Sequence, residues 1–270
     1  MGKESKKTKY ILISTSLIFL IVMLLFPLTL ILVEALKKGI DAYFKAVTDN
    51  YTFKALNFTI LATLIATILN TIFGVIAAWA ITKFDFKGKN FLTTLIDLPF
   101  AISPVIAGLI FILAFGRDGL FESLITKLDV QIVFALPGVI LATVFVTFPF
   151  VAREVIPLMH AQGKSEEEAA ALMGASGFRI FRKVTFPNIK WGLVYGVILC
   201  AARAMGEFGA VSVVSGHIRG QTNTLPLHVE ILYSEYQFSA AFAVASILVI
   251  LAVIILVLRN LIELKMKKGA

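Results

Sequence analysis

Long apolar stretches alternate with short polar segments along the chain. An apolar α-helix of about 20 residues crosses the roughly 30 Å hydrocarbon core of a bilayer, because each residue adds about 1.5 Å. Six stretches meet this length, and they cover residues 11–33, 57–81, 95–115, 132–152, 191–214 and 240–258. The pattern predicts an all-α, polytopic membrane protein with six transmembrane helices and both ends on the same side of the membrane.

Composition agrees with this prediction, because 59% of the 270 residues are hydrophobic and the mean hydropathy is +0.90. The first apolar run is longer than the core of a signal peptide, so we expect it to be retained as a span. With the N-terminus inside, seventeen Lys and Arg lie on the inner side and seven on the outer side. The positive-inside rule therefore predicts N-in/C-in topology. The net charge of +8 then indicates contact with membrane lipid and no nucleic acid.

A polar insert at 165–187 separates the fourth and fifth apolar stretches. Ser165 and Glu168 have the spacing of a capping box at a helix start, and acidic residues there complement the helix dipole. Gly174 stands where a left-handed residue ends such a helix. We expect two short helices outside the bilayer. From the residues alone, an ordinary amphipathic cytoplasmic loop is the simpler interpretation.

The spacing within this insert favours a more specific interpretation. Glu168-Ala169-Ala170 is followed by Gly174 and then, after nine residues, by Val184 and Phe186-Pro187. The pattern resembles the EAA loop of binding-protein-dependent ABC importer permeases, with Val184 in place of isoleucine and Phe186 in place of leucine. The resemblance implies a cytoplasmic coupling helix, between transmembrane helices 4 and 5, that seats in a groove of the ATPase subunit. The residues implied in this coupling are Glu168, Ala169, Ala170, Gly174 and Pro187.

The second apolar stretch, 57–81, carries small and hydroxyl side chains at helical spacing. Small side chains let helix backbones approach closely in lipid, and threonine and asparagine hydrogen-bond across such contacts. The small and amide positions, four residues apart, are Ala62, Ala66, Asn70, Gly74 and Ala78. We expect this helix to be buried in the bundle by packing, rather than to line a pathway.

Ionisable residues in or near the spans are the candidates for a translocation pathway or gate, since charge in a membrane is costly. Arg203 and Glu207 are four residues apart, hence on one face of the predicted 191–214 helix and able to pair. A structural pair and a pathway role stay equally open. Asp97, with two prolines following it, predicts a kinked or broken start to the third span. We interpret Asp97 first as a residue that caps a helix or forms a salt bridge, and a gate role is the alternative.

Other chemistry is not expected in this chain. Cys200 is the only cysteine, and His217 and His228 are isolated, so we predict no disulfide and no metal site. The sequence has no Gly-x-x-x-x-Gly-Lys-Ser/Thr phosphate loop. We therefore expect no ATPase activity and no enzyme in this chain.

Residues 96–108 and 202–220 are similar to the sulfate/thiosulfate importer permeases, W-type subunit, and the similarity runs from about residue 50 to 262. The resemblance implies a multi-pass subunit of the inner (cytoplasmic) membrane that imports sulfate or thiosulfate. It implies a heterodimer with a T-type permease subunit, two ATPase subunits that bind ATP and magnesium, and an extracytoplasmic sulfate-binding protein. No cofactor is implied in the chain itself. The domains expected are a cytoplasmic tail (1–10), a first transmembrane helix (11–33), an importer domain (57–262) and a second tail (263–270).

Two alternatives stay open. Molybdate and tungstate permeases share the Ala-Arg-Ala-x-Gly-Glu-Phe-Gly pattern found at 202–209, so this fragment does not fix the anion. A secondary anion transporter or channel also suits a charge at mid-membrane, but it does not explain the coupling-type loop. In the last outer loop, Arg219 is the candidate charge for docking the binding protein, with a solvated loop residue as the equal alternative.

Overall fold

The structure is a computed structural model that describes residues 6–268, and within them every regular element is a helix. The predicted tails 1–10 and 263–270 extend beyond the described residues. The elements are α1 (Lys6–Leu20), η1 (Ile21–Leu25), α2 (Phe26–Leu36), α3 (Ile40–Val47), α4 (Asn50–Lys83), α5 (Lys89–Ala101), α6 (Pro104–Phe115), α7 (Glu122–Leu128), α8 (Leu136–Gln162), α9 (Ser165–Leu172), α10 (Gly177–Ile180), η2 (Phe181–Thr185), α11 (Phe186–Met205), α12 (Gly209–Val214), α13 (Leu225–Ser234) and α14 (Phe238–Lys268).

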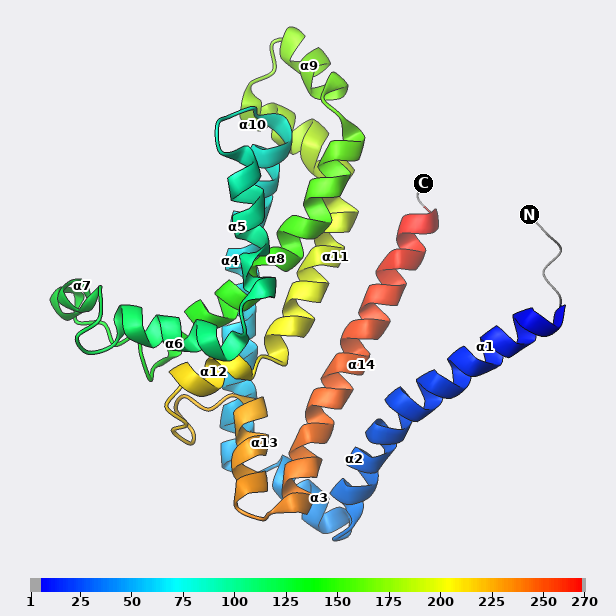
Figure 1. Ribbon diagram of the computed structural model, residues 1–270, viewed down its shortest axis with the longest axis vertical. Helices are drawn as coiled ribbons and strands as arrows, with labels where there is room; N and C mark the ends of the chain where they lie inside the picture. Colours follow the sequence, from blue (N-terminus) through cyan, green and yellow to red (C-terminus); the bar gives the residue numbers. More distant parts are fainter. Residues whose placement is uncertain (1–5, 269–270) are drawn as a thin grey trace.

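Figure 1 shows a bundle of α4, α5, α8 and α11 with short helices at both ends. Helices α9 and α10 lie at one end, and α3 and α13 lie at the other. The α1–α2 arm diverges from the bundle, so that it meets the rest of the chain near α3 and α14 and is separate from it elsewhere. Helices α6 and α7 project sideways from the middle of the bundle.

The membrane-spanning segments follow the hydropathy pattern closely. Five continuous helical segments are long and apolar enough to cross a membrane, and they are Lys7–Leu36, Asn50–Lys83, Leu136–Gln162, Gly177–Met205 and Phe238–Leu264. The predicted third span, 95–115, is broken into α5 and α6, which are bent by 109°. Ser103 has an extended ψ of 132° because the residue before a proline avoids the helical region. The prediction of a broken helix at this place is confirmed.

The predicted bounds of the fifth span, 191–214, are wrong at both ends. The helical segment begins at Gly177, so the second half of the polar insert is continuous with the span. It ends at Met205, and α12 begins only at Gly209. The hydropathy pattern missed this break because apolar residues continue on both sides of Gly206.

Two short π-helical turns interrupt long helices at equivalent places. Turn η1 ends two residues before Pro27, and η2 ends two residues before Pro187. Proline lacks the N–H that would bond to the carbonyl four residues earlier, which frees the carbonyls of Met23 and Lys183. A wider turn accommodates the free carbonyl and the proline ring. The position of each turn therefore follows from the local sequence.

Helix α4 is the central element of the bundle. Its small residues are buried against α8 and α11, as predicted from their four-residue spacing; Ala66, Asn70 and Ala78 have no exposed surface. The Asn70 amide donates to the hydroxyl of Thr147 at 2.8 Å and to the carbonyl of Val144 at 3.2 Å. At the other end, the hydroxyl of Thr59 accepts the N–H of Leu225 at the start of α13, at 2.7 Å. Helix α4 is therefore hydrogen-bonded both to α8 and to α13.

We predict that Gly108→Ala destabilises the fold through the crossing of α6 and α12. A Cβ at Gly108 would lie 2.7 Å from the carbonyl oxygen of Ala210 and 2.9 Å from the Cβ of Val213. Backbone and Cβ atoms cannot move aside cheaply, so the cost is about 1–3 kcal/mol. Gly206→Ala is the control, because a Cβ there meets nothing within 4 Å and Gly206 has a φ of −93°. Thermal unfolding of both variants in detergent measures the difference, and equal midpoints would contradict the prediction.

Candidate functional site

Helix α9 lies beyond the end of the bundle, as the first short helix expected in the polar insert (Figure 1). Its first turn carries Glu166, Glu167 and Glu168, which complement the helix dipole. The predicted capping box is wrong. Lys164 is the N-cap residue, Ser165 is already the first helical residue, and no side chain caps the start.

The end of α9 agrees with the prediction for Gly174, which has a φ of +82°. The N–H of Gly174 donates to the carbonyl of Ala171 at 2.9 Å, and the N–H of Ala175 donates to the carbonyl of Ala170 at 3.1 Å. These two bonds form a Schellman motif, which requires a left-handed residue at this position. The glycine thus turns the chain from α9 toward α10.

Large apolar side chains are exposed around this turn. Leu172 is 90% exposed, Met173 is 89% exposed, and Phe178 on α10 is 74% exposed. Glu168 and Ala169 are also exposed, Ala170 is half-buried, and Pro187 is exposed at the second position of α11. An exposed apolar group with charged neighbours at the end of a bundle is typical of a protein interaction surface.

The loop is fastened to the bundle by a residue that the sequence analysis did not select. Glu167 accepts the hydroxyl of Thr185 at 2.5 Å and forms an ion pair with Lys83 at 3.0 Å. Lys83 also donates to the carbonyl of Gly163, at 2.6 Å. The only signal in the sequence was a lysine at the end of an apolar stretch, and it does not identify which of three adjacent glutamates is the partner.

Asp97 lies inside α5 and forms a two-point contact with Arg153 of α8. The Nε of Arg153 is 2.8 Å from Oδ1, and its Nη2 donates to Oδ2 at 3.3 Å. The guanidinium also lies 4.9 Å from the ring centroid of Phe100. The predicted salt bridge is confirmed, whereas the capping alternative is wrong because the helix begins eight residues earlier, at Lys89.

Arg203 and Glu207 form the predicted pair, with Nη1 2.7 Å from Oε2. The sequence predicts the pair on one face of a continuous helix. In the structure α11 ends at Met205, so the pair bridges the break before α12. The Glu207 side chain is only 1% exposed, and its Oε1 accepts the N–H of Ala210 at 2.9 Å. The carboxylate therefore stabilises the start of α12 as well as the charge of Arg203.

Arg219 lies at the opposite end of the bundle from α9 and is paired with Glu235 at 2.5 Å. His228, in α13 nearby, is buried and its Nε2 lies 3.2 Å from the hydroxyl of Thr52. Burial lowers the pKa of His228, and the positive charge of Arg219 lowers it further, against the opposing effects of Asp49 and Glu235. Among the described residues, no group of three or more His, Cys, Asp and Glu is placed to hold a metal ion.

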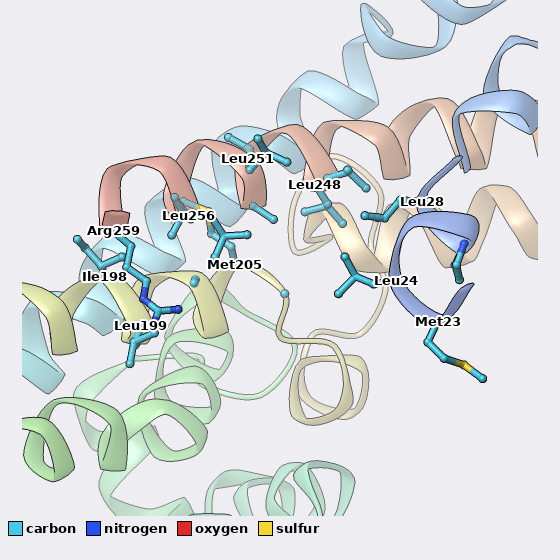
Figure 2. Close-up of a pocket in the computed structure, with 17 residues that line it drawn as sticks. Met23, Leu24, Leu28, Ile198, Leu199, Met205, Leu248, Leu251, Leu256 and Arg259 are labelled. Atoms are coloured by element: carbon cyan, nitrogen blue, oxygen red, sulfur yellow. The ribbon is translucent and has the colours of Figure 1, made fainter. Parts of the chain in front are cut away.

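A groove of about 690 Å³ lies between the α1–α2 arm and the pair α11 and α14 (Figure 2). Leu24 and Leu28 project into it from the arm, and Met205, Leu248 and Leu256 project from the opposite side (Figure 2). This lining is almost wholly apolar, with Arg259 at one end. The groove therefore suits lipid chains or an apolar helix and offers little to a hydrated anion.

We predict that Arg203→Ala is more harmful to stability than the double variant Arg203→Ala/Glu207→Ala. The single change leaves the buried carboxylate without its partner, which costs about 3–5 kcal/mol, whereas the double change leaves no buried charge. Arg219→Ala is the control, since its pair with Glu235 is partly exposed and is worth about 1 kcal/mol or less. The midpoint of thermal unfolding in detergent measures all three variants. A double variant that unfolds at the same or a lower temperature than Arg203→Ala would exclude the pairing.

Comparison with known proteins identifies the family. Residues 70–268 match the family model described as binding-protein-dependent transport system inner membrane component. The chain is 49% identical to the sulfate transport system permease protein CysW of Synechocystis sp., over 95% of this chain and 93% of that protein. It is 34% identical to the sulfate transport system permease protein CysT of Salmonella typhimurium, over 95% of this chain and 92% of that protein.

The fold has a solved counterpart as well. A bacterial ABC transporter that imports the acidic polysaccharide alginate contains a chain with a TM-score of 0.78, covering 97% of this chain and 95% of that one, at 15% sequence identity. The identity is too low for inference beyond the fold. The family match, the CysW similarity over nearly the full length and the shared fold agree. This chain belongs to the binding-protein-dependent transport system inner membrane components, and within that family it groups with the CysW-type permeases.

Proposed function

We propose that this chain is the W-type permease subunit of an ATP-driven importer for sulfate or thiosulfate. The observation that carries the proposal is the similarity to CysW, which extends over nearly the whole of both chains at 49% identity, against 34% for CysT. The chain supplies part of the membrane pathway, and a separate ATPase binds ATP and magnesium and supplies the energy.

The topology in this proposal is N-in/C-in, with α9 in the cytoplasm. The excess of Lys and Arg on the α9 side supports this orientation. The exposed apolar turn of Leu172 and Met173 would then seat in a groove of the ATPase. Glu168, Ala169 and Ala170 present one side of the coupling helix, Gly174 shapes its end, and Pro187 sets the start of α11.

The partners in this proposal are a T-type permease subunit, two ATPase subunits and an extracytoplasmic sulfate-binding protein. The similarity to both CysW and CysT proteins supports a pair of related, non-identical membrane subunits. The α1–α2 arm is the part of the chain most open to a second subunit, because none of the most apolar 18-residue window of Lys7–Leu36 is buried within the described chain. Arg219 is proposed as a docking charge for the binding protein at the opposite end.

The pathway residues in this proposal are Arg203, Glu207 and Asp97. Each of them is neutralised by a partner within the chain, at 2.7 Å for Arg203 and Glu207 and at 2.8 Å for Asp97 and Arg153. Such a site would hold a dianion weakly. A weak site suits an importer, because a tightly bound dianion would not be released, and selectivity then lies mainly in the binding protein.

The test of the proposal is ATP-driven uptake of radiolabelled sulfate into vesicles that hold the whole complex. We expect uptake that requires ATP and the binding protein and that thiosulfate inhibits, whereas phosphate does not. Molybdate that competes better than sulfate would move the assignment to a molybdate or tungstate importer. Uptake without ATP would indicate a secondary anion transporter, and transport of a sugar or an amino acid would refute the assignment.

We predict that Gly174→Val uncouples ATP hydrolysis from uptake. A Cβ at this position meets nothing within 4 Å, so the effect arises from the backbone, which has a φ of +82°. A β-branched residue in that conformation is strained by about 1–3 kcal/mol and would reshape the end of α9. Gly174→Asn is the matched control because asparagine tolerates the left-handed region. Uptake and substrate-stimulated hydrolysis at wild-type levels in Gly174→Val would contradict the coupling role.

A further inference from the structure

The coupling loop is joined to the bundle by a largely buried polar cluster that consists of Lys83, Glu167 and Thr185, which we name the polar latch. We propose that the polar latch transmits displacement of α9 to α4 and α11, with Glu167 as the positioning residue for coupling. The inference rests on the proposed function, in which an ATPase contacts α9. It differs from the role implied for Glu168, because Glu168 faces outward and Glu167 faces the bundle.

One carboxylate oxygen is the centre of the latch. Oε1 of Glu167 lies 3.0 Å from Nζ of Lys83 and accepts the hydroxyl of Thr185 at 2.5 Å. Lys83 is the last residue of α4, and Thr185 is the last residue of η2, directly before α11. Lys83 also donates to the carbonyl of Gly163, in the link that leads into α9. Four parts of the chain therefore meet within one hydrogen-bonded group.

Burial makes this contact different from an ordinary surface ion pair. The side chains of Lys83 and Glu167 are 5% and 13% exposed, and Thr185 is fully buried. Water cannot readily replace either partner, so separating the charges would leave each of them uncompensated. A displacement of α9 is then more readily followed by α4 and α11 than absorbed by breaking the pair.

A second ion pair joins the same two regions and provides an internal comparison. Nζ of Lys164, at the N-cap of α9, lies 3.5 Å from a carboxylate oxygen of Asp85, two residues after Lys83. Both side chains are exposed, at 43% and 82%, and such pairs contribute little. Hydrogen bonding from Lys89 and the charge of Lys164 lower the pKa of Asp85, so it stays ionised. The two pairs match in charge and location and differ in burial.

The end of α4 is held against η2 without the latch. The rings of Trp79 and Phe181 lie 5.0 Å apart, and Trp79 also packs on Phe84 at 6.0 Å. Helix α9 itself makes a few contacts with α10 and η2. The latch is therefore not required to join α4 and α11. It adds the link between α9 and the end of α4, and it supplements the hydrogen bond that Nδ2 of Asn188 in α11 donates to Oε2 of Glu166 in α9, at 2.7 Å.

The test uses the purified complex of permease subunits, ATPase and binding protein in vesicles. Glu167→Gln and Lys83→Met each remove one charge with little change in shape. We expect the amount of ATPase that copurifies with each variant to stay within twofold of wild type. Sulfate transported per ATP hydrolysed should fall at least tenfold. Asp85→Asn is the matched control and should leave both quantities within twofold.

The double variant Lys83→Met/Glu167→Gln separates transmission from simple stability. It leaves no unpaired charge in the cluster, so any loss in the yield of assembled complex within that twofold range should disappear, while the transport per ATP stays at least tenfold low. Recovery of both quantities would assign the pair to stability alone and overturn the proposal, as would full coupling in Glu167→Gln. If the wild-type complex itself imports no sulfate, the proposed function fails instead, which distinguishes the two outcomes.

Discussion

Close approach between α4 and α8 is the constraint on which the rest of the structure depends. Helices in lipid gain little from apolar contact alone, so they associate where small side chains let their backbones meet and polar groups bond across the contact. The buried alanines of α4 and Gly74 provide that approach, and Asn70 bonds to α8 at the same place. Thr59 of the same helix accepts a hydrogen bond from the start of α13, so α4 also positions α13.

The charged pairs of the bundle lie near places where helices end or break. Lys83 is the last residue of α4, Glu207 follows the end of α11, and Asp97 precedes the break between α5 and α6. Helix termini leave backbone groups free, and a side chain there can satisfy both a backbone group and an opposite charge. Lys83 does this with the carbonyl of Gly163, and Glu207 does it with the N–H of Ala210. Such breaks are also the places where helices change direction, which connects the charges with movement.

The two sides of α9 have different physical properties. One side faces outward with exposed leucine and methionine, which suits a partner that covers apolar surface. The other side is held by a largely buried ion pair, which favours movement as a unit. A helix that connects an ATPase with a membrane bundle requires both properties, because it has to bind on one side without becoming detached on the other. In this chain the polar latch provides the second of these properties, the attachment of α9 to the bundle.

The sequence by itself determined the features that depend on neighbouring residues. It predicted the all-helical membrane fold, the broken third span at its prolines, the left-handed Gly174 and the burial of the small residues of α4, because dihedral preference and helical periodicity are local. The tertiary structure alone decided that the fifth span ends at Met205, that Arg153 is the partner of Asp97, and that Glu167 rather than its neighbours pairs with Lys83. These outcomes depend on residues far apart in the chain, such as Lys83 and Glu167, which only helix packing brings within hydrogen-bonding distance.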